Sequence, residues 1–515
     1  MDEDKINLPL AAAVFVSITA LLFYTNGNRF FLTSDEGIIL DGAVRMMSGE
    51  TLYRDFFGYM TPGSYWIQEA VFSLFGVSIR SGRIVVILDF ALQCSILFWL
   101  TALLAGRKAA LLATILFAPL QLNNREYLVA QHRMDSAALA LLSIAFCVQG
   151  QRRAKAWYWA AAGLLSIAAA LCTPSVGLIA VVTVVWLCAD RSLRRFLVPY
   201  CGGLAAGTLA ALTVLIATGM LKPLVDQLVW LNRNYTTVNY MPYGSIIGGY
   251  GAALAGSTGG ELVVRAVVLF CIALLAVLPV AMIAAWTWTV FNASRKARLP
   301  QIVRRTIPYL LGCMTVLVAS TYPRSDLFHL AFVAALPYVL AAAWISWYVP
   351  RPYITFILYL PGMVAIALAL QIPMRFRTEV PVATAIGTVR VPPVDVDGMR
   401  KLLDYVHPGD TLYVHPYAPI LYVLTQAQNP TRYSYMWPGL MTGDDAAAAL
   451  SDLKKTPPKT VMYLEVDRDE YLRVFPNAYK LNHRFPNIED WIAREYVPVE
   501  PPVWITGYRL YERRQ

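Results

Sequence analysis

Long apolar segments separated by short polar ones fill the first 371 residues of the chain. Segments of this kind predict membrane-crossing helices, because a span needs about 20 mostly apolar residues. About eleven occur, several shorter than a usual span, at 8–25, 82–104, 107–122, 135–150, 156–171, 174–189, 195–217, 262–290, 307–321, 327–348 and 353–371. The pattern predicts a polytopic α-helical membrane protein.

The loops between these segments alternate in charge. Every second loop is basic and holds almost no acidic residue beyond Asp190. The basic residues are Arg107 and Lys108; Arg152, Arg153 and Lys155; Arg191, Arg194 and Arg195; Arg295, Lys296, Arg298, Arg304 and Arg305; and Arg351. By the positive-inside rule these loops and the N-terminus face the cytoplasm. The outward segments are then 26–81, 121–134, 172–174, 218–261, 321–327 and the chain after 372.

The last part of the chain, 373–515, alternates short strand-like runs with helical segments. A strand leads into a helix at 411–424, a helix is expected at 444–453, and strands are expected at 460–466 and 504–513. We predict a membrane module at 1–372 and a small α/β domain at 373–515 on the periplasmic side. That domain contains no cysteine, so we expect it to fold on its own core without disulfides.

Composition agrees with a membrane protein. The chain is 57% hydrophobic and 15% charged, which excludes an ordinary soluble enzyme and a disordered chain. The net charge of +10 comes entirely from the first 373 residues, where membrane topology explains it, so we do not expect nucleic-acid binding. No GxxxxGK[ST] motif occurs, which argues against direct ATP hydrolysis. The acidic start, MDEDK, favours a retained first span over a cleaved signal peptide.

The first outward loop, 26–81, is too apolar for a plain loop and too polar for a span. Apolar residues at helical spacing after Asp35, and again after Pro62, predict two amphipathic helices lying at the membrane surface. Asp35 and Glu36 fall in the first turn of the first helix, where the helix dipole favours carboxylates. That placement alone explains the pair. Its position directly after the first span also suits a general base acting on an acceptor hydroxyl.

This loop resembles the first outer loop of the GT-C glycosyltransferases. The resemblance is to the branch with protein O-mannosyltransferases, lipid A aminoarabinose transferases and related bacterial polyprenyl-phosphate-sugar transferases. It is carried by the Asp35–Glu36 pair, LYRDFF (52–57), Pro62–Gly63 with Tyr65, LFG (74–76) and, in the last domain, the segment 417–439. These motifs cover about a fifth of the chain, and the many spans with an outer C-terminal domain also fit.

The resemblance implies a GT-C fold and a sugar donor carried on a polyprenyl phosphate. It implies that Asp35 activates the acceptor and that the sugar transfers in one step with inversion. Glu36 would support Asp35 or bind substrate. The acceptor would be a hydroxyl of a lipid, a glycan or a protein, and the enzyme would lie in a bacterial cytoplasmic membrane.

A phosphate leaving group needs cations nearby. The loop 123–135 offers Arg125, His132 and Arg133, which alternatively serve as membrane-surface anchors. The loop 321–330 offers Arg324, Asp326 and His329; there the alternative is a turn in which Asp326 caps the next helix. Arg54 and Asp55 either line the site or pair with each other.

Three further features have less specific interpretations. The segment 230–251 is rich in Tyr, Asn and Gly, which suits interfacial aromatic residues or a substrate lid. Asp89 lies within the second span, where it has a functional or a pairing role. The five histidines are scattered and predict no metal site, which leaves any dependence on a divalent cation open.

Two other classes of protein compete with the glycosyltransferase. A secondary transporter usually has repeated halves and broken helices, whereas here one long first loop and one outer domain have no counterpart in another half. A non-catalytic envelope assembly protein would tolerate the loss of Asp35. The sequence specifies neither the sugar nor the acceptor.

Overall fold

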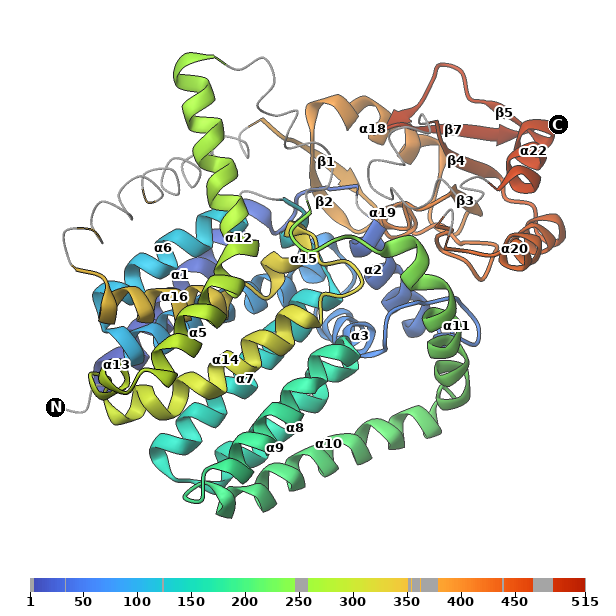
Figure 1. Ribbon diagram of the computed structural model, residues 1–515. Coiled ribbons are helices and arrows are strands. Elements are labelled where there is room, and N and C mark those ends of the chain that lie inside the picture. The colour runs from blue at the N-terminus through green and yellow to red at the C-terminus, as the bar shows by residue number, and fades with distance from the viewer. Residues whose placement is uncertain are drawn as a thin grey trace.

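The computed structural model describes residues 4–32, 34–122, 125–245, 258–350, 378–437, 440–465 and 485–514, with Tyr353 and Gly362. An elongated bundle of helices carries a smaller α/β domain at one end, and the two termini lie at opposite ends of the molecule (Figure 1).

Ten helices of the bundle overlap the first ten predicted spans. They are α1 (Asp4–Asn26), α5 (Ile84–Ala105), α6 (Arg107–Leu122), α7 (His132–Arg153), α8 (Ala156–Cys172), α9 (Ile179–Ala189), α10 (Leu197–Ala217), α12 (Gly259–Phe291), α14 (Gln301–Ala319) and α16 (Ala335–Tyr348). The tenth predicted span, 327–348, is wrong at its start, where a separate short helix, α15 (Leu327–Phe332), precedes the main helix. Within the described part of the chain, six helical stretches are long and apolar enough to cross a membrane. The eleventh prediction, 353–371, lies outside the described residues apart from Tyr353 and Gly362.

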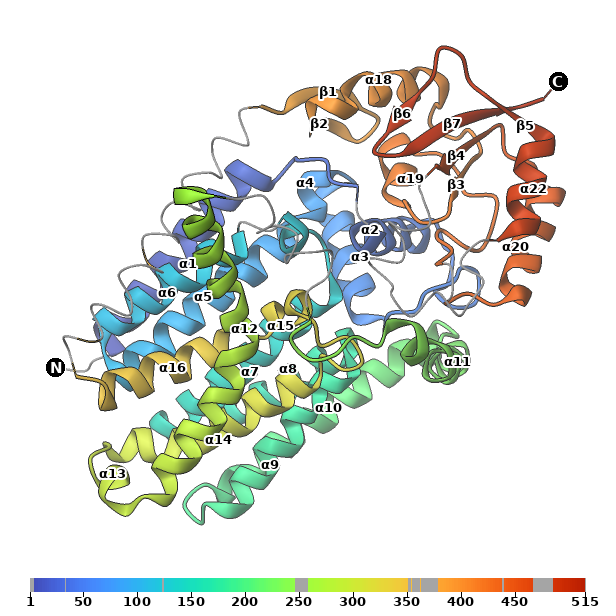
Figure 2. The ribbon, with the colours of Figure 1, turned by 45° about the horizontal axis from the view of Figure 1, so that its top comes forward.

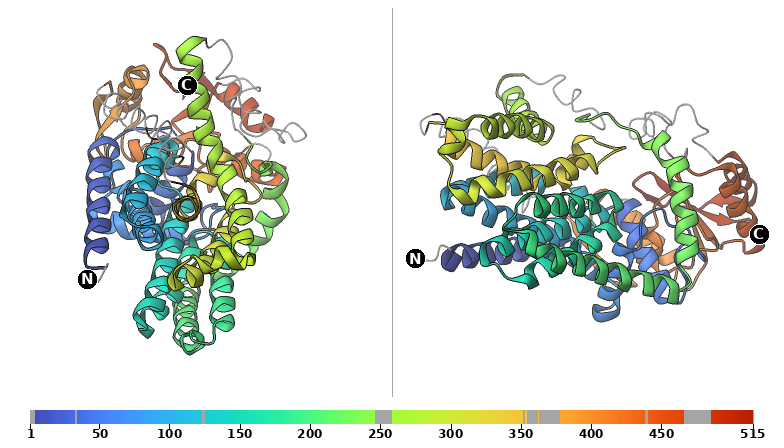
Figure 3. Two further views of the ribbon diagram at one scale, coloured as in Figure 1. Left: turned by 60° about the vertical axis from the view of Figure 1, so that its left-hand side comes forward. Right: turned by 60° about the horizontal axis from the view of Figure 1, so that its bottom comes forward.

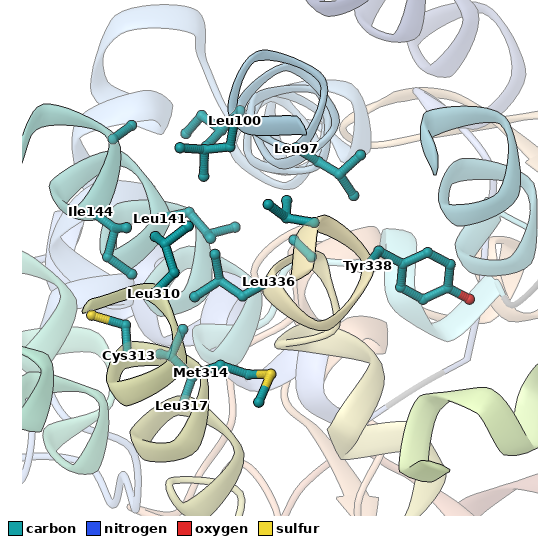
Figure 4. Packing of buried hydrophobic residues seen from close by; sticks show 14 of the residues in the cluster. Leu97, Leu100, Leu141, Ile144, Leu310, Cys313, Met314, Leu317, Leu336 and Tyr338 are labelled. Carbon is teal, nitrogen blue, oxygen red and sulfur yellow. The ribbon is translucent and has the colours of Figure 1, made fainter. Parts of the chain in front are cut away.

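The bundle core is built from residues of helices remote in sequence. Figure 4 shows Leu97 of α5, Leu141 of α7, Leu310 of α14 and Leu336 of α16 pointing toward one another. Small residues let some helices approach more closely. A Cβ atom at Gly203 of α10 would lie 2.0 Å from the Ala160 carbonyl oxygen of α8, so only glycine fits there.

The two ends of the bundle differ as the charge pattern predicts. The short helix α13 (Ala293–Ala297), in a basic loop, lies near the N-terminal end of α1 (Figure 2). The first outward loop, the short helices η1 (Arg125–Leu128) and α15 (Leu327–Phe332), and the C-terminal domain lie at the other end. Which end faces the cytoplasm stays a prediction.

The first outward loop contains the two predicted helices, α2 (Ser34–Met47) and α3 (Gly63–Phe75), followed by the single turn α4 (Ile79–Gly82). Asp35 and Glu36 occupy the first turn of α2, and Pro62 occupies the N-cap of α3, as predicted. The loop therefore forms a folded platform across the end of the bundle.

The C-terminal region is the predicted α/β unit. The hairpin β1 (Val380–Thr384) and β2 (Gly387–Val391) precedes a five-stranded sheet of order β3-β4-β7-β5, with β6 paired to β7. Its strands are β3 (Leu412–His415), β4 (Thr460–Leu464), β5 (Tyr496–Pro498), β6 (Trp504–Ile505) and β7 (Tyr508–Arg513). Its helices are η4 (Pro393–Asp395), α18 (Val396–Tyr405), α19 (Ile420–Thr425), α20 (Gly443–Lys455) and α22 (Pro486–Glu495).

The expectation that this domain folds on its own core is wrong. One hydrophobic cluster joins Ile38 and Tyr65 of the first outward loop to Ile420 and Tyr435 of the C-terminal region. The two regions also share polar contacts, because Arg29, just after α1, forms a buried ion pair with Glu379. Loop and domain therefore form one structural unit, since both contribute apolar residues to the same core.

The segment between α10 and α12 is more ordered than the predicted loop. It contains the 19-residue helix α11 (Leu221–Asn239), which crosses the end of the bundle between the other helices and the C-terminal domain (Figure 3). The prediction missed it because its asparagine and tyrosine residues are typical of loops. Residues 246–251, the last part of the predicted lid segment, lie outside the described residues.

The connections that lead into α9 and α10 are short. The 3-10 helices η2 (Pro174–Leu178) and η3 (Arg194–Phe196) precede α9 and α10 respectively. η2 lies at the end of the bundle that carries α3, because the Thr61 hydroxyl donates to the carbonyl oxygen of Cys172, two residues before η2.

Candidate active site

Asp35 is the centre of the candidate site. Its Oδ2 atom accepts a hydrogen bond of 2.7 Å from Nε2 of Gln131, the residue that precedes α7. Burial raises the pKa of Asp35, while the Gln131 hydrogen bond and the charges of Arg324 and Arg133 act to lower it. Asp35 is therefore a desolvated carboxyl group whose negative form is supported by two cations.

The two arginines come from segments remote in the chain. Arg133 lies in the first turn of α7, and Arg324 lies in the loop between α14 and α15. Both act electrostatically on Asp35, so the fold brings this carboxyl group together with cations from two loops that are predicted to face outward. In the described part of the chain, Arg133 forms no ion pair with an acidic side chain within 4.0 Å. Its charge is thus available to an anionic ligand.

The late loop forms the predicted cluster of Arg324, Asp326 and His329. Asp326 caps α15 by accepting from the His329 backbone N–H at 2.9 Å, and it also contacts the His329 ring at 2.8 Å and Arg324 Nε at 3.1 Å. Burial acts to raise the pKa of Asp326, but the His329 hydrogen bonds and Arg324 outweigh it and the pKa is lowered. Asp326 stays ionised and orients Arg324.

Two neighbouring segments hold this loop in place. The backbone N–H of Met241 donates to the Pro323 carbonyl at 2.9 Å, and that of Gly244 donates to the Ser325 carbonyl at 2.8 Å. On the other side, the Tyr127 hydroxyl donates to the Phe328 carbonyl at 2.7 Å. The position of Arg324 is therefore fixed by the chain after α11 and by η1.

His132 is close to the site but is directed elsewhere. Its Nδ1 atom lies 3.0 Å from Thr173 Oγ1 and 3.3 Å from the Cys172 carbonyl oxygen. These contacts tie the start of α7 to the end of α8. In this geometry His132 holds the first turn of α7, which carries Arg133, against the end of α8. The side chain of Arg125, the first residue of η1, lies outside the described part.

Glu36 does not share the environment of Asp35. It forms a buried ion pair with Arg83, and both side chains are 1% exposed. Arg83 also donates to the carbonyl oxygens of Asn26 and Arg29, each at 3.1 Å. Glu36 thus ties α2 to the turn before α5 and to the end of α1, and this leaves it no contact with the arginines of the site.

Arg54 and Asp55 pair with each other, which is the second of the two predicted arrangements. Two hydrogen bonds of 2.9 and 2.7 Å join them, and the Arg54 side chain is 55% exposed. The hydrogen bond from Arg54 is the largest influence on the pKa of Asp55, which falls to about 2. Asp55 also accepts from the Thr51 backbone N–H, so this pair forms a local turn.

Sequence reasoning assigned no role in the site to four residues that lie near Asp35. They are Gln131, Tyr59, Tyr65 and Tyr435, which are all less than 9% exposed and come from the start of α7, the first outward loop, α3 and the C-terminal region. Gln131 was within the segment predicted to bind phosphate. Tyr65 and Tyr435 belonged to segments that carry the family resemblance, but nothing in the sequence separated their function from that of ordinary buried tyrosines.

No metal centre is found among the described residues, since no group of three His, Cys, Asp or Glu side chains lies close enough to hold an ion. The carboxyl group of Asp89 in α5 interacts instead with that of Asp135 in α7. This agrees with the alternative in which Asp89 pairs with a neighbouring helix.

Comparisons with known proteins find resemblance in structure only. No family model and no curated protein sequence matches the chain. The solved structures that resemble it include members of the GT-C fold. One is ArnT from Cupriavidus metallidurans, bound to undecaprenyl phosphate (12% identity, TM-score 0.43) and in the apo state (14%, 0.42); both cover 97% of each chain. Another is the Archaeoglobus fulgidus oligosaccharyltransferase in the apo form, at 11% identity and a TM-score of 0.48, covering 98% of this chain and 74% of that one.

Proposed function

We propose that this protein is an inverting glycosyltransferase. It moves a sugar from a polyprenyl-phosphate donor to an acceptor hydroxyl at the outer face of a bacterial cytoplasmic membrane. The observation that supports this most is the meeting of buried Asp35 with the charges of Arg133 and Arg324. A base and two cations at the membrane-surface end of a helical bundle suit an anionic leaving group anchored in the lipid.

The proposed reaction is a single displacement. The acceptor hydroxyl gives its proton to Asp35 as its oxygen forms a bond to the anomeric carbon of the sugar. The bond from that carbon to the phosphate oxygen breaks, and the electron pair leaves with the polyprenyl phosphate. Attack opposite the leaving group inverts the anomeric centre.

Each group of the site has a task in this step. Gln131 holds the Asp35 carboxylate at 2.7 Å, and desolvation raises its basicity. Arg133 and Arg324 stabilise the charge that develops on the phosphate, and the buried surroundings strengthen that interaction. Asp326 keeps Arg324 directed by the 3.1 Å contact to its Nε atom.

The test uses the full chain in lipid nanodiscs with a panel of labelled polyprenyl-phosphate sugars. We expect one donor to release lipid phosphate and transfer its label. Asp35→Asn is expected to lower this turnover by about 10²–10⁴-fold, as for loss of a general base, while donor binding persists. Asp397→Asn, on the exposed side of α18, is the matched control and is expected to retain full activity.

Variants of Arg133 separate donor binding from proton transfer to Asp35. Arg133→Gln is expected to raise the donor KM about 10- to 100-fold, in line with about 1.5–3 kcal/mol for a hydrogen bond to a charged group, and Arg133→Lys by less. Unchanged turnover in Asp35→Asn would move the base to another residue. Absence of binding and turnover with every donor would reject the proposal and favour transport.

A further inference from the structure

Two buried polar atoms near Asp35 have no hydrogen-bond partner among the described residues. They are Oη of Tyr65, whose residue is 1% exposed, and Oε1 of Gln131, whose residue is 3% exposed. An unpaired buried polar atom costs about 1–3 kcal/mol, and native proteins contain few of them. Tyr65 interacts electrostatically with both Asp41 and Asp35, and Gln131 is hydrogen-bonded to Asp35. The two unpaired atoms therefore suit a ligand that supplies hydrogen-bonding groups in this region.

The orientation of Tyr65 is fixed by glycines in two other segments. A Cβ atom at Gly42 of α2 would lie 2.4 Å from Tyr65 Cε1, and one at Gly58 would lie 3.3 Å from Tyr65 Oη. The ring fits only because Gly42 lacks a side chain, and Gly58 leaves room for its hydroxyl. Its hydroxyl is therefore held in a defined place, and burial raises its pKa, so it remains a hydrogen-bond donor.

The orientation of Gln131 is fixed by Asp35. An ionised carboxylate only accepts hydrogen bonds, so the amide nitrogen of Gln131 faces it at 2.7 Å. The amide oxygen then presents an acceptor. Around Asp35 the protein thus offers a base, a hydroxyl donor and an amide acceptor.

Aromatic rings from three segments gather beside the same carboxylate. Tyr59 interacts with Asp35 and packs against Tyr235 of α11 at 6.0 Å, Tyr435 at 5.9 Å and Trp437 at 5.1 Å between ring centroids. Aromatic surfaces with a few placed polar groups are typical of small-molecule sites, including those that bind the apolar faces of ring-shaped ligands.

We propose that the acceptor is a carbohydrate. Tyr65 and Gln131 bind a ring hydroxyl next to the one that Asp35 deprotonates, and Tyr59 and Trp437 lie against the sugar ring. The inference rests on the proposed function and gives it an acceptor class. A sugar ring presents neighbouring hydroxyls that both donate and accept hydrogen bonds, which suits one unpaired donor and one unpaired acceptor. A serine or threonine side chain has only one hydroxyl, which Asp35 takes, and offers no second one beside it.

The experiment measures two reactions of the full chain in nanodiscs with a donor that the wild type turns over. The first is release of lipid phosphate to water without acceptor, and the second is transfer to an added acceptor. Short glycans are compared with peptides containing serine and threonine. We expect transfer to at least one glycan, with kcat/KM for the peptides at least 100-fold lower.

Tyr65→Phe removes only the unpaired hydroxyl. It is expected to raise the acceptor KM about 10-fold and to leave donor hydrolysis within about twofold of wild type. Tyr496→Phe is the matched control, because it removes a buried hydroxyl that donates to the Pro458 carbonyl at 2.7 Å in the C-terminal sheet. That control is expected to leave both reactions unchanged. Trp437→Phe gives a second test and is expected to raise the same KM.

Two results would overturn the inference alone. One is preferred transfer to the peptides, and the other is an equal loss of hydrolysis and transfer in correctly folded Tyr65→Phe. If the wild type turns over no donor at all, the proposed function fails as well. Asp35-dependent hydrolysis with transfer to no glycan would preserve the proposed function and reject the carbohydrate acceptor.

Discussion

Asp35 and Glu36 are neighbours in sequence but belong to different parts of the structure. Consecutive residues of an α-helix point about 100° apart, so their side chains do not face each other. Asp35 points to Gln131, and Glu36 points to Arg83. The pair that the sequence presents as one motif is therefore divided, with the chemistry on Asp35 and the anchoring of α2 on Glu36.

We expect Glu36→Gln to lower the stability of the protein strongly and to lower turnover less than Asp35→Asn does. Removing one partner leaves the Arg83 charge buried, which typically costs about 3–5 kcal/mol. The thermal unfolding temperature in detergent checks this, and the paired change Glu36→Gln with Arg83→Met is expected to recover part of the loss. Normal stability combined with an activity loss as large as that of Asp35→Asn would contradict the structural role.

At the scale of elements, α2 is positioned by the C-terminal region. A Cβ atom at Gly37 would lie 2.3 Å from the Ile420 backbone nitrogen at the start of α19. Further along α2, Asp41 accepts a hydrogen bond from the Ser434 hydroxyl, and Arg45 donates to Ser434 Oγ at 3.0 Å. The helix that carries Asp35 is thus held from the side opposite the bundle.

Gly37→Ala is expected to separate α2 from α19 and so displace Asp35. Overpacking of a close contact commonly costs about 1–3 kcal/mol, and a small shift of the base would also lower turnover. Gly443→Ala is the control, since a Cβ atom there would contact nothing within 4 Å. Unfolding temperature and donor turnover are measured for both. Equal behaviour of the two variants would show that the close approach is unimportant.

The contact of Asp41 with the C-terminal region should depend on pH. Burial raises the pKa of Asp41 from 3.8 to about 6, so the folded protein holds this proton more tightly than the unfolded chain. Its contribution to stability is complete below about pH 3.8 and is lost as the pH rises through about 6. The difference corresponds to at most about 3 kcal/mol.

Asp41→Asn is therefore expected to flatten the pH dependence of the unfolding temperature between pH 4 and 7. The amide still offers an oxygen to Ser434 but does not ionise. The exposed variant Asp397→Asn should retain the wild-type dependence. If Asp41→Asn and wild type change in parallel with pH, another group controls the transition.

The elements were largely predictable because their signals are local. Apolar length and periodicity identify α2, α3 and the long helices of the bundle within a short window of sequence. The site was only partly predictable. Arg133 and Arg324 were selected because a phosphate leaving group needs cations in the outward loops, but the contact of Gln131 with Asp35 depends on how α7 packs against α2. No local pattern encodes that distance.

At the scale of the whole molecule, the end that carries the site is built from the first outward loop and the C-terminal domain together. If the basic loops are cytoplasmic, this end faces outward. Asp397→Cys on α18 should react with a membrane-impermeant maleimide in intact cells. Ser294→Cys in α13 should react only after the membrane is opened. Replacing Cys188 and Cys201, both exposed, with serine removes background labelling. Reversed labelling would reverse the orientation.

The attachment of the Arg324 loop to distant segments has a consequence for synthesis of the chain. Asp35 leaves the ribosome first, and Arg324 follows 289 residues later. At about 5–20 residues per second, this delay is roughly 15–60 s. During that time the carboxyl group lacks its second cation, and α2 lacks the C-terminal residues that hold it. If the proposed function holds, we expect a chain that ends before its last domain to consume no donor.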